Sequence, residues 1–224
     1  MKTAKIIKLD RELLRNRDQA VKAIGDICKE ISKGGIVIMP TDTAYGIAAD
    51  ATNEDAVKKV FEIKNRDESK AIPIIVSDMY MIKEYAEISP LAEYLAREYM
   101  PGPLSLIVPQ KADGKLAKTL SAKGVAFRVP SNEFARALVS ECSVPLTATS
   151  ANISGDGPIY NIDEIKMLFQ NKAQVIIDGG NLVPTPPSTI IDLQESEPKV
   201  IREGPISSVE ILRDIAEFKA KNTA

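Results

Sequence analysis

Residues 40–46 and 147–155 are polar, turn-forming segments that could carry chemistry, because each includes or follows an apolar run expected to be a strand. The first holds two threonine hydroxyls, a carboxylate and a glycine, and the second ends in hydroxyls, an amide and a glycine. Open α/β sheets bind ligands at strand ends, and such segments can hold a small polar molecule or an anion. They could equally only cap turns. Ser188 and Arg202 add a hydroxyl and a cation near later strand ends.

Cations gather at two other places. Lys64, Arg66 and Lys70 fall within seven residues at the end of an expected helix, and the planar guanidinium of Arg66 suits a carboxylate or a phosphate. A helix C-terminus also favours cations, so a solvated helix end is the alternative interpretation. Arg128 interrupts an apolar run at residues 124–130. If Arg128 is buried, it needs an anion as a partner. If it lies on a solvated face of the strand, it needs no such partner.

The elements that must position these side chains alternate between short apolar runs and segments of helical periodicity. A first helix is expected from near Asp18 to just before Gly34. Further helices are expected at residues 54–63, 78–86, 90–99, 132–141, 162–169 and 208–219, and strands at 36–39, 72–76, 104–108, 125–129, 146–149, 175–178, 189–193 and 200–202. The pattern predicts an α/β domain with a dispersed site for a polyanion or an amino acid.

The composition excludes several classes of site. With no histidine, the chain has no Ser-His-Asp or Cys-His centre and no imidazole base. Lys and Arg total 29 against 31 Asp and Glu, a formal charge of −2, which predicts a local anion pocket rather than general attraction to nucleic acid. Cys28 and Cys142 form no metal-spaced cluster. Neither a secretory signal nor an apolar run of membrane length is recognised, so we expect a cytoplasmic protein without a membrane partner.

Taken together and in order, these segments resemble the YrdC family, the threonylcarbamoyl-AMP synthases. The resemblance extends from Gly34 to about Pro205, and its strength is the ordered co-occurrence of motifs that are each weak alone. The motifs lie at residues 40–46 (Pro-Thr-Asp-Thr-Ala-Tyr-Gly), 64–66 (Lys-x-Arg), 101–104 (Pro-Gly-Pro-Leu), 128–130 (Arg-Val-Pro), 149–155 (Thr-Ser-Ala-Asn-Ile-Ser-Gly), 187–192 (Pro-Ser-Thr-Ile-Ile-Asp) and 201–204 (Ile-Arg-x-Gly).

The resemblance implies one catalytic domain over residues 1–224, with a twisted, mixed parallel and antiparallel sheet flanked by helices around a basic concave cleft. The last residues, 221–224, are expected to be a frayed tail. It implies that L-threonine, bicarbonate and ATP give threonylcarbamoyl-AMP and pyrophosphate, for the threonylcarbamoyladenosine modification of tRNA position 37. Mg²⁺ would accompany ATP, without an organic cofactor, and a tRNA threonylcarbamoyl transferase complex would receive the product. The chain ends too early for the C-terminal extension of longer members, so it resembles the short, single-domain form.

The resemblance also implies roles for individual residues. Lys64 and Arg66 would be catalytic, through charge on the phosphates. L-threonine would be bound by Thr43, Ile75, Arg128, Ser150 and Ser188, with Arg128 at its carboxylate. ATP would be bound by Arg66, Lys70, Gly124, Asn152, Tyr160 and Arg202, and no metal-ligating residue is implied. Ile75 and Tyr160 differ in type from the residues of relatives, so their roles would rest on the backbone.

The sequence departs from the family pattern at several positions. Asp67 stands where relatives usually have proline, and Pro158-Ile159-Tyr160 replaces Ser-Pro-Thr. Arg202-Glu203-Gly204 replaces Arg-Pro-Gly. The alternative function is a non-catalytic paralogue that binds double-stranded RNA or tRNA. A paralogous branch of the family lacks the Lys-x-Arg and Ser-Ala-Asn motifs, and both are present here.

Overall fold

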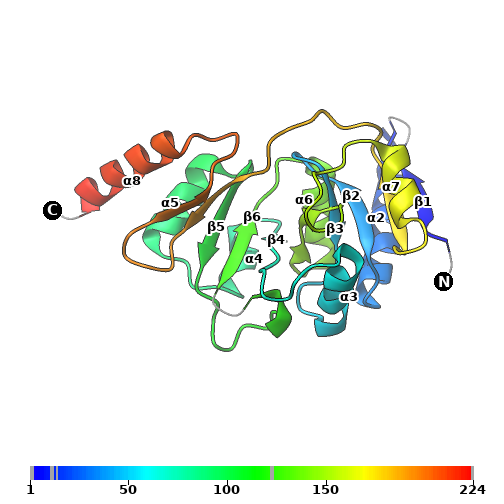
Figure 1. The fold of residues 1–224 in the computed structure, drawn as a ribbon, viewed down its shortest axis with the longest axis horizontal. Helices are drawn as coiled ribbons and strands as arrows, with labels where there is room; N and C mark the ends of the chain where they lie inside the picture. The colour runs from blue at the N-terminus through cyan, green and yellow to red at the C-terminus, as the bar shows by residue number, and fades with distance from the viewer. Residues whose placement is uncertain (1–2, 11–12, 14, 122–123, 223–224) are drawn as a thin grey trace.

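The computed structural model describes residues 3–10, 13, 15–121 and 124–222, and its strands form two mixed sheets (Figure 1). The first sheet has the order β1 (Lys5–Lys8), β9 (Val175–Asp178), β2 (Val37–Pro40), β3 (Tyr45–Ala48) and β8 (Thr149–Ser150). All of β2 is buried; it pairs in parallel with β9 and antiparallel with β3. The turn at residues 41–44 therefore becomes the tip of a hairpin.

The second sheet has the order β11 (Lys199–Arg202), β10 (Thr189–Asp192), β5 (Leu104–Val108), β6 (Val125–Arg128), β4 (Ile74–Ile75) and β7 (Leu146–Thr147). The chain crosses between the sheets at Ala148, which alone separates β7 from β8. It crosses again along residues 179–188, which run over the top of Figure 1 from β9 to β10. One hydrophobic cluster joins the sheets, with Ile38 and Ile47 from the first and Leu104 and Phe127 from the second.

The helices are α2 (Arg17–Ser32), α3 (Glu54–Lys64), α4 (Met79–Lys83), α5 (Pro90–Tyr99), α6 (Glu133–Cys142), α7 (Ile162–Phe169) and α8 (Ser208–Asn222), with a 3₁₀ turn at Lys118–Leu120. Asparagine side chains cap α2, α3, α6 and α7. The cap of α2 is Asn16, so Asp18, the expected cap, lies in the first turn instead. Gly34 follows α2 with φ of 75°, a conformation that suits glycine. None of the described helices is both long and apolar enough to cross a membrane.

The mixed α/β class expected from the sequence is confirmed, but the strands form two sheets where one was expected. The strands β1 and β3 were not predicted. Tyr45–Ala48 begins inside the motif at residues 40–46, which was expected to be a turn, and forms a strand because it pairs with β2 and β8. The helix α8 continues to Asn222, beyond the expected end near residue 219, and residues 223–224 of the expected tail lie outside the described residues.

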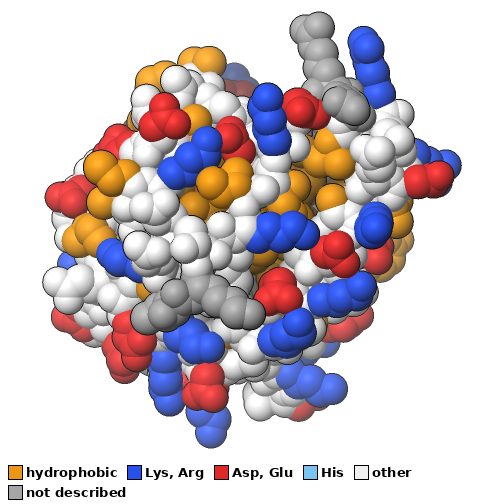
Figure 2. All heavy atoms as spheres, turned by 90° about the vertical axis from the view of Figure 1, so that its right-hand side faces the viewer, with side chains coloured by type: hydrophobic (Ala, Val, Ile, Leu, Met, Phe, Trp, Pro, Cys, Tyr) orange, Lys and Arg blue, Asp and Glu red, His pale blue; other side chains and the backbone are white. Residues whose placement is uncertain are grey.

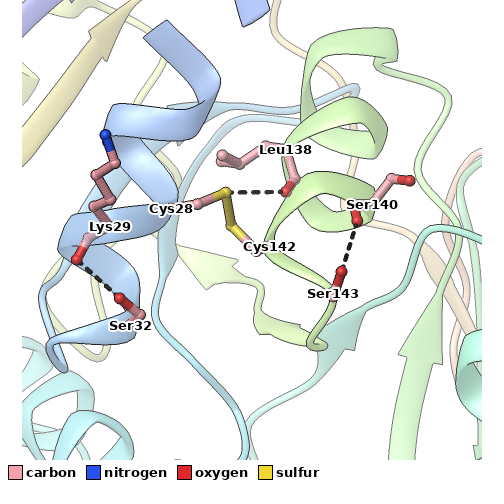
Figure 3. The surroundings of a disulfide bond; sticks show 7 residues. All are labelled: Cys28, Lys29, Ser32, Leu138, Ser140, Cys142 and Ser143. Atoms are coloured by element: carbon pink, nitrogen blue, oxygen red, sulfur yellow. Dashed lines mark hydrogen bonds between the residues drawn. A yellow bond between two sulfur atoms is a disulfide. The ribbon is translucent and has the colours of Figure 1, made fainter. Parts of the chain in front are cut away.

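A disulfide joins Cys28 of α2 to Cys142 of α6, at a sequence separation of 114 (Figure 3). The two helices pack against each other, and both cysteines lie at a cluster of buried residues that includes Ile27 and Leu138. Spacing along the sequence could not reveal this pair, because the contact depends on how the helices pack.

The double variant Cys28→Ser/Cys142→Ser should unfold at lower urea concentration than the wild type. Closing a loop of this length restricts the unfolded chain and contributes about 5 kcal/mol in the chain-entropy model. Reductant should lower the midpoint of the wild type and leave that of the double variant unchanged. Equal midpoints for the oxidised wild type and the double variant would contradict a stabilising disulfide.

Candidate active site

A pocket of about 410 Å³ opens between the two sheets, where the polar segments meet. The first sheet contributes the β2–β3 turn and β8, and the second contributes residues of β4, β5, β6, β10 and β11. Residues 179–188 contribute Thr185, Pro187 and Ser188. The polar and charged residues of the lining are Thr41, Thr43, Tyr45, Arg66, Ser105, Arg128, Thr149, Ser150, Asp156, Thr185, Ser188 and Arg202.

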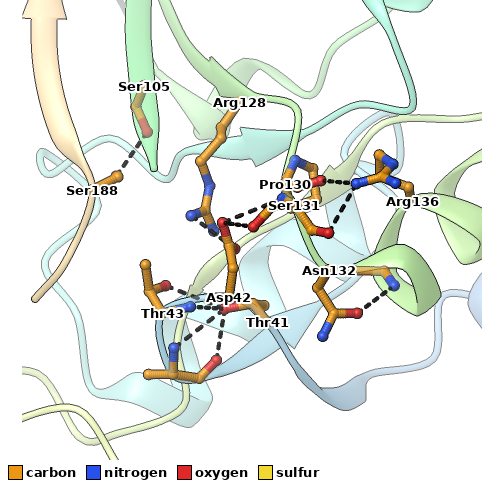
Figure 4. A network of polar contacts seen from close by, with 12 residues as sticks. Thr41, Asp42, Thr43, Ser105, Arg128, Pro130, Ser131, Asn132, Arg136 and Ser188 are labelled. Carbon is orange, nitrogen blue, oxygen red and sulfur yellow. Dashed lines mark hydrogen bonds and ion pairs between the residues drawn. The ribbon is translucent and has the colours of Figure 1, made fainter. Parts of the chain in front are cut away.

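Arg128, the last residue of β6, is buried beside a carboxylate (Figure 4). Its Nη1 lies 3.0 Å from Oδ1 of Asp42, and the two side chains are 7% and 11% exposed. The other oxygen of Asp42 accepts hydrogen bonds from the backbone N–H of Ser131 at 3.3 Å and from its hydroxyl at 3.1 Å. Burial lowers the pKa of Arg128, and the charge of Asp42 opposes that shift. The sequence left open whether Arg128 is buried beside an anion or lies on a solvated face of its strand, and the structure shows that it is buried and paired.

The Arg128–Asp42 ion pair keeps capacity for a ligand. Nη1 of Arg128 and Oδ1 of Asp42 are buried, yet neither has a hydrogen-bond partner of good geometry among the described atoms. Their 3.0 Å contact is an ion pair. Because buried polar atoms are normally hydrogen-bonded, a guanidinium in this state is suited to an anionic group entering the pocket.

Two other guanidiniums in the lining have no acidic partner among the described residues. Arg66 donates to the backbone carbonyls of Lys70 at 3.2 Å and Ala71 at 2.9 Å, and burial lowers its pKa. Arg202 is exposed as a residue, but its guanidinium is partly enclosed, and this burial followed by the charge of Arg128 lowers its pKa. The pocket thus concentrates positive charge that a bound anion would neutralise.

Hydroxyl groups lie beside these cations. Oγ of Ser105 and Oγ of Ser188 are 2.9 Å apart, and both residues are buried (Figure 4). Arg202 holds Ser188 by donating to its carbonyl at 3.0 Å and to its hydroxyl at 3.3 Å. In the β2–β3 turn, Oγ1 of Thr41 donates to the carbonyl of Ala44 at 2.7 Å. Thr41 therefore caps the turn, and both Thr41 and Thr43 line the pocket, so residues 40–46 form a capped turn and contribute to the site.

The structure brings six of the predicted site residues into one lining: Thr43, Arg66, Arg128, Ser150, Ser188 and Arg202. Lys64 and Asn152 lie outside the lining and contact each other, 1% and 5% exposed. Lys70 is exposed, with its carbonyl accepting from Arg66.

The remaining predicted residues also lie outside the lining. Ile75 is buried in a hydrophobic cluster. Gly124 precedes β6, about 13 Å along the strand from Arg128 at its other end. The hydroxyl of Tyr160 donates to the carbonyl of Thr185 at 3.0 Å and so holds residues 179–188 at the edge of the pocket.

Ser105 lines the pocket, and Asp42 lies outside the lining as the partner of Arg128; the sequence analysis assigned neither residue an individual role. A signal for each is present in the sequence. An arginine buried in a strand requires an anion or a carboxylate, and Asp42 is an acid in another of the polar motifs. Ser105 is a polar residue within an otherwise apolar strand, as Arg128 is.

A larger hollow, of about 510 Å³, lies at the outer edge of the first sheet between α2, β1 and residues 171–175. It contains none of the predicted site residues. Figure 2 views this end of the molecule and shows basic and acidic side chains interspersed across it. Lys29 and Lys33, which line the hollow, are paired with Asp26 and Glu30. We therefore place the candidate site in the pocket between the sheets.

Asp42→Ala should lower the free energy of unfolding by about 3 kcal/mol, because Arg128 would stay buried without its carboxylate. Urea denaturation near pH 7 measures the change. Glu62→Ala, which removes an exposed acid on α3, is the matched control and should change stability by less than about 0.5 kcal/mol. A loss from Asp42→Ala as small as that of the control would contradict a structural role for the ion pair.

Comparison with known proteins identifies the fold and its relatives. The family model Sua5/YciO/YrdC, described as telomere recombination, matches residues 29–204. A Methanocaldococcus jannaschii protein, provisionally named a threonylcarbamoyl-AMP synthase, is 38% identical over 209 residues, covering 93% of this chain and 97% of that protein. The threonylcarbamoyl-AMP synthase of Pyrococcus abyssi is 36% identical over 190 residues, covering 84% of this chain and 56% of that protein.

Solved structures of family members have the same fold as this chain. The crystal structure of P. abyssi Sua5 complexed with L-threonine superposes with a TM-score of 0.84 at 32% identity, covering 96% of this chain and 61% of that one. Escherichia coli YciO superposes with a TM-score of 0.79 at 25% identity, covering 92% of this chain and 98% of that one. This chain therefore spans only about three fifths of the Pyrococcus protein. The family match over most of its length means that the chain belongs to the Sua5/YciO/YrdC family.

Proposed function

We propose that this chain is a threonylcarbamoyl-AMP synthase, which makes threonylcarbamoyl-AMP and pyrophosphate from L-threonine, bicarbonate and ATP. The observation that carries the proposal is the joint placement of Arg66, Arg128 and Arg202 in one pocket lined with hydroxyls. The anionic groups of this reaction are the threonine carboxylate, bicarbonate and the ATP triphosphate, and a pocket lined by more cations than acids suits them. Family membership and relatives named as this synthase support the same activity.

In the proposed reaction, bicarbonate takes up a proton and loses water to give carbon dioxide. The neutral amine of threonine attacks its carbon, so that an N–C bond forms and a C=O π pair moves to oxygen. The nitrogen then releases a proton, which balances the one taken up by bicarbonate, and the product is a carbamate. A carbamate oxygen then attacks the α-phosphorus of ATP. The bond from that phosphorus to the oxygen of the β-phosphate breaks, and pyrophosphate leaves with the electron pair. Arg128 orients the threonine carboxylate, and Arg66 and Arg202 stabilise charge on the phosphoryl oxygens.

Mg²⁺ would enter with ATP and neutralise part of the phosphate charge. Among the described residues, no group of three acidic or cysteine side chains is arranged to hold a metal ion. The product would pass to a tRNA threonylcarbamoyl transferase complex. We also propose a cytoplasmic location, which requires that the Cys28–Cys142 disulfide form in a compartment where such bonds are uncommon.

The RNA-binding alternative is not favoured. Relatives of similar sequence are named as synthases, and the formal charge of −2 gives no general electrostatic attraction to phosphate backbones. Acidic side chains also interrupt the basic ones over the face in Figure 2.

Arg66→Ala should reduce pyrophosphate release by about 100-fold, because it removes a preorganised cation from the phosphates. The measurement is pyrophosphate release with product mass analysis in ATP, Mg²⁺, L-threonine and bicarbonate, with each omitted in turn. Arg97→Ala, an exposed arginine on α5 paired with Glu98, is the matched control and should retain wild-type turnover. Near-wild-type turnover in folded Arg66→Ala, or a wild type that forms no adduct, would contradict the proposal.

Ser188→Ala should weaken the preference for threonine over valine by about tenfold, because a buried partner for the substrate hydroxyl is lost. The quantity to compare is the ratio of kcat/KM for the two amino acids. Ser140→Ala, at an exposed serine of α6, is the control and should leave the ratio unchanged. An unchanged ratio in Ser188→Ala would remove Ser188 from hydroxyl recognition.

A further inference from the structure

We propose that Lys64 is a positioning residue: its ammonium group holds the turn at residues 150–156 in the shape that presents Ser150 to the pocket, and it is not a ligand of the ATP phosphates. The inference deepens the proposed function and rests on it for the identity of the substrate. The contacts that carry the inference are independent of that identity.

Oxygen atoms of the turn enclose the ammonium group of Lys64. Its Nζ donates to the backbone carbonyl of Ser150 at 2.5 Å and to that of Asn152 at 2.9 Å. It also donates to Oδ1 of the Asn152 side chain at 2.9 Å, and Lys64 as a whole is 1% exposed. An ammonium group has three hydrogens. All three have acceptors within the protein, so none remains for a phosphate oxygen.

The same contact fixes the orientation of Asn152 and, through it, of Ser150. An ammonium group can only donate, so the atom of Asn152 that faces Lys64 is its carbonyl oxygen. The amide nitrogen accordingly donates to the backbone carbonyls of Ile153 and Asp156. Because Oδ1 can only accept, the hydroxyl of Ser150 must donate its hydrogen to that atom. Ser150 is left with its lone pairs, and therefore accepts a hydrogen bond from an ammonium or hydroxyl group of the substrate.

The backbone of Lys64 holds the same turn. Its carbonyl accepts from the backbone N–H of Ser154 at 2.8 Å. Lys64 ends α3, and the next residue, Asn65, has φ of 50°, which turns the chain. Arg66 consequently reaches the pocket, whereas Lys64 stays behind its wall. Burial, followed by the charge of Arg66, lowers the pKa of Lys64 to about 8. The three fixed acceptors offset part of the cost of burying this charge.

The test is the affinity for L-threonine alone, measured by calorimetry without ATP at pH 7. Lys64→Met should bind threonine at least tenfold more weakly than the wild type, because Ser150 loses its orientation. Lys58→Met, at an exposed lysine of the same helix, is the matched control and should bind threonine normally. A lysine that acted only on phosphates would leave threonine affinity unchanged in Lys64→Met and weaken ATP binding alone, and this result would overturn the proposal.

Asn152→Ala provides a second variant in case Lys64→Met fails to fold. It keeps the ammonium group and removes its link to the Ser150 hydroxyl. We expect the same loss of threonine affinity as in Lys64→Met, and threonine affinity within twofold of the wild type would contradict the proposed link.

Hydrogen–deuterium exchange separates this inference from the proposed function. In Lys64→Met, backbone amides of residues 150–156 should exchange at least tenfold faster than in the wild type and in Lys58→Met, whereas amides of β2 keep their protection. A wild type that neither binds threonine nor releases pyrophosphate would remove the proposed function, and the exchange result would still decide whether Lys64 holds the turn. Unchanged exchange across residues 150–156 would overturn the inference.

Discussion

A cation that leaves water must find fixed oxygen atoms in the protein, and this requirement organises both walls of the pocket. Lys64 donates hydrogen bonds to two backbone carbonyls and to the side chain of Asn152, and these bonds hold the turn after β8 against the end of α3. Arg128 forms an ion pair with Asp42, and this pair connects the end of β6 to the β2–β3 turn. Asp42 also binds Ser131, so the chain after β6 is anchored to the same turn.

These anchors matter because the pocket lies between two sheets rather than within one. Ala148 passes the chain directly from β7 to β8, and residues 179–188 pass it back from β9 to β10. The hydroxyl of Tyr45 donates to the carbonyl of Gly180 at 2.7 Å and accepts from the N–H of Gly179 at 3.0 Å, which fixes the start of the second crossing. The segments proposed to contact the amino acid and the phosphates are distant in sequence, and these anchors fix them relative to one another. A reaction between two bound substrates requires such fixed positions.

Much of this arrangement could be predicted from the sequence, and the remainder depends on packing. Apolar runs gave the position of β5, and helical periodicity gave α5 and α7 with their observed bounds. The motifs supplied Arg66, Arg128 and Ser188 as pocket residues. The different directions of Lys64 and Arg66 could not be predicted, because they depend on the left-handed conformation of Asn65, which turns the chain between them. The partnership of Asp42 with Arg128 joins segments that only the tertiary fold brings together.

We assign different roles to the two cations of one short motif: Arg66 faces the ligand, and Lys64 shapes the wall behind it. A crystal structure with L-threonine and a non-hydrolysable ATP analogue tests this most directly. We expect the threonine carboxylate at Arg128 and a phosphate at Arg66, with Nζ of Lys64 still hydrogen-bonded to Ser150 and Asn152. A structure in which Nζ of Lys64 has left those oxygens to bind a phosphate, or in which the ligands lie outside this pocket, would contradict it.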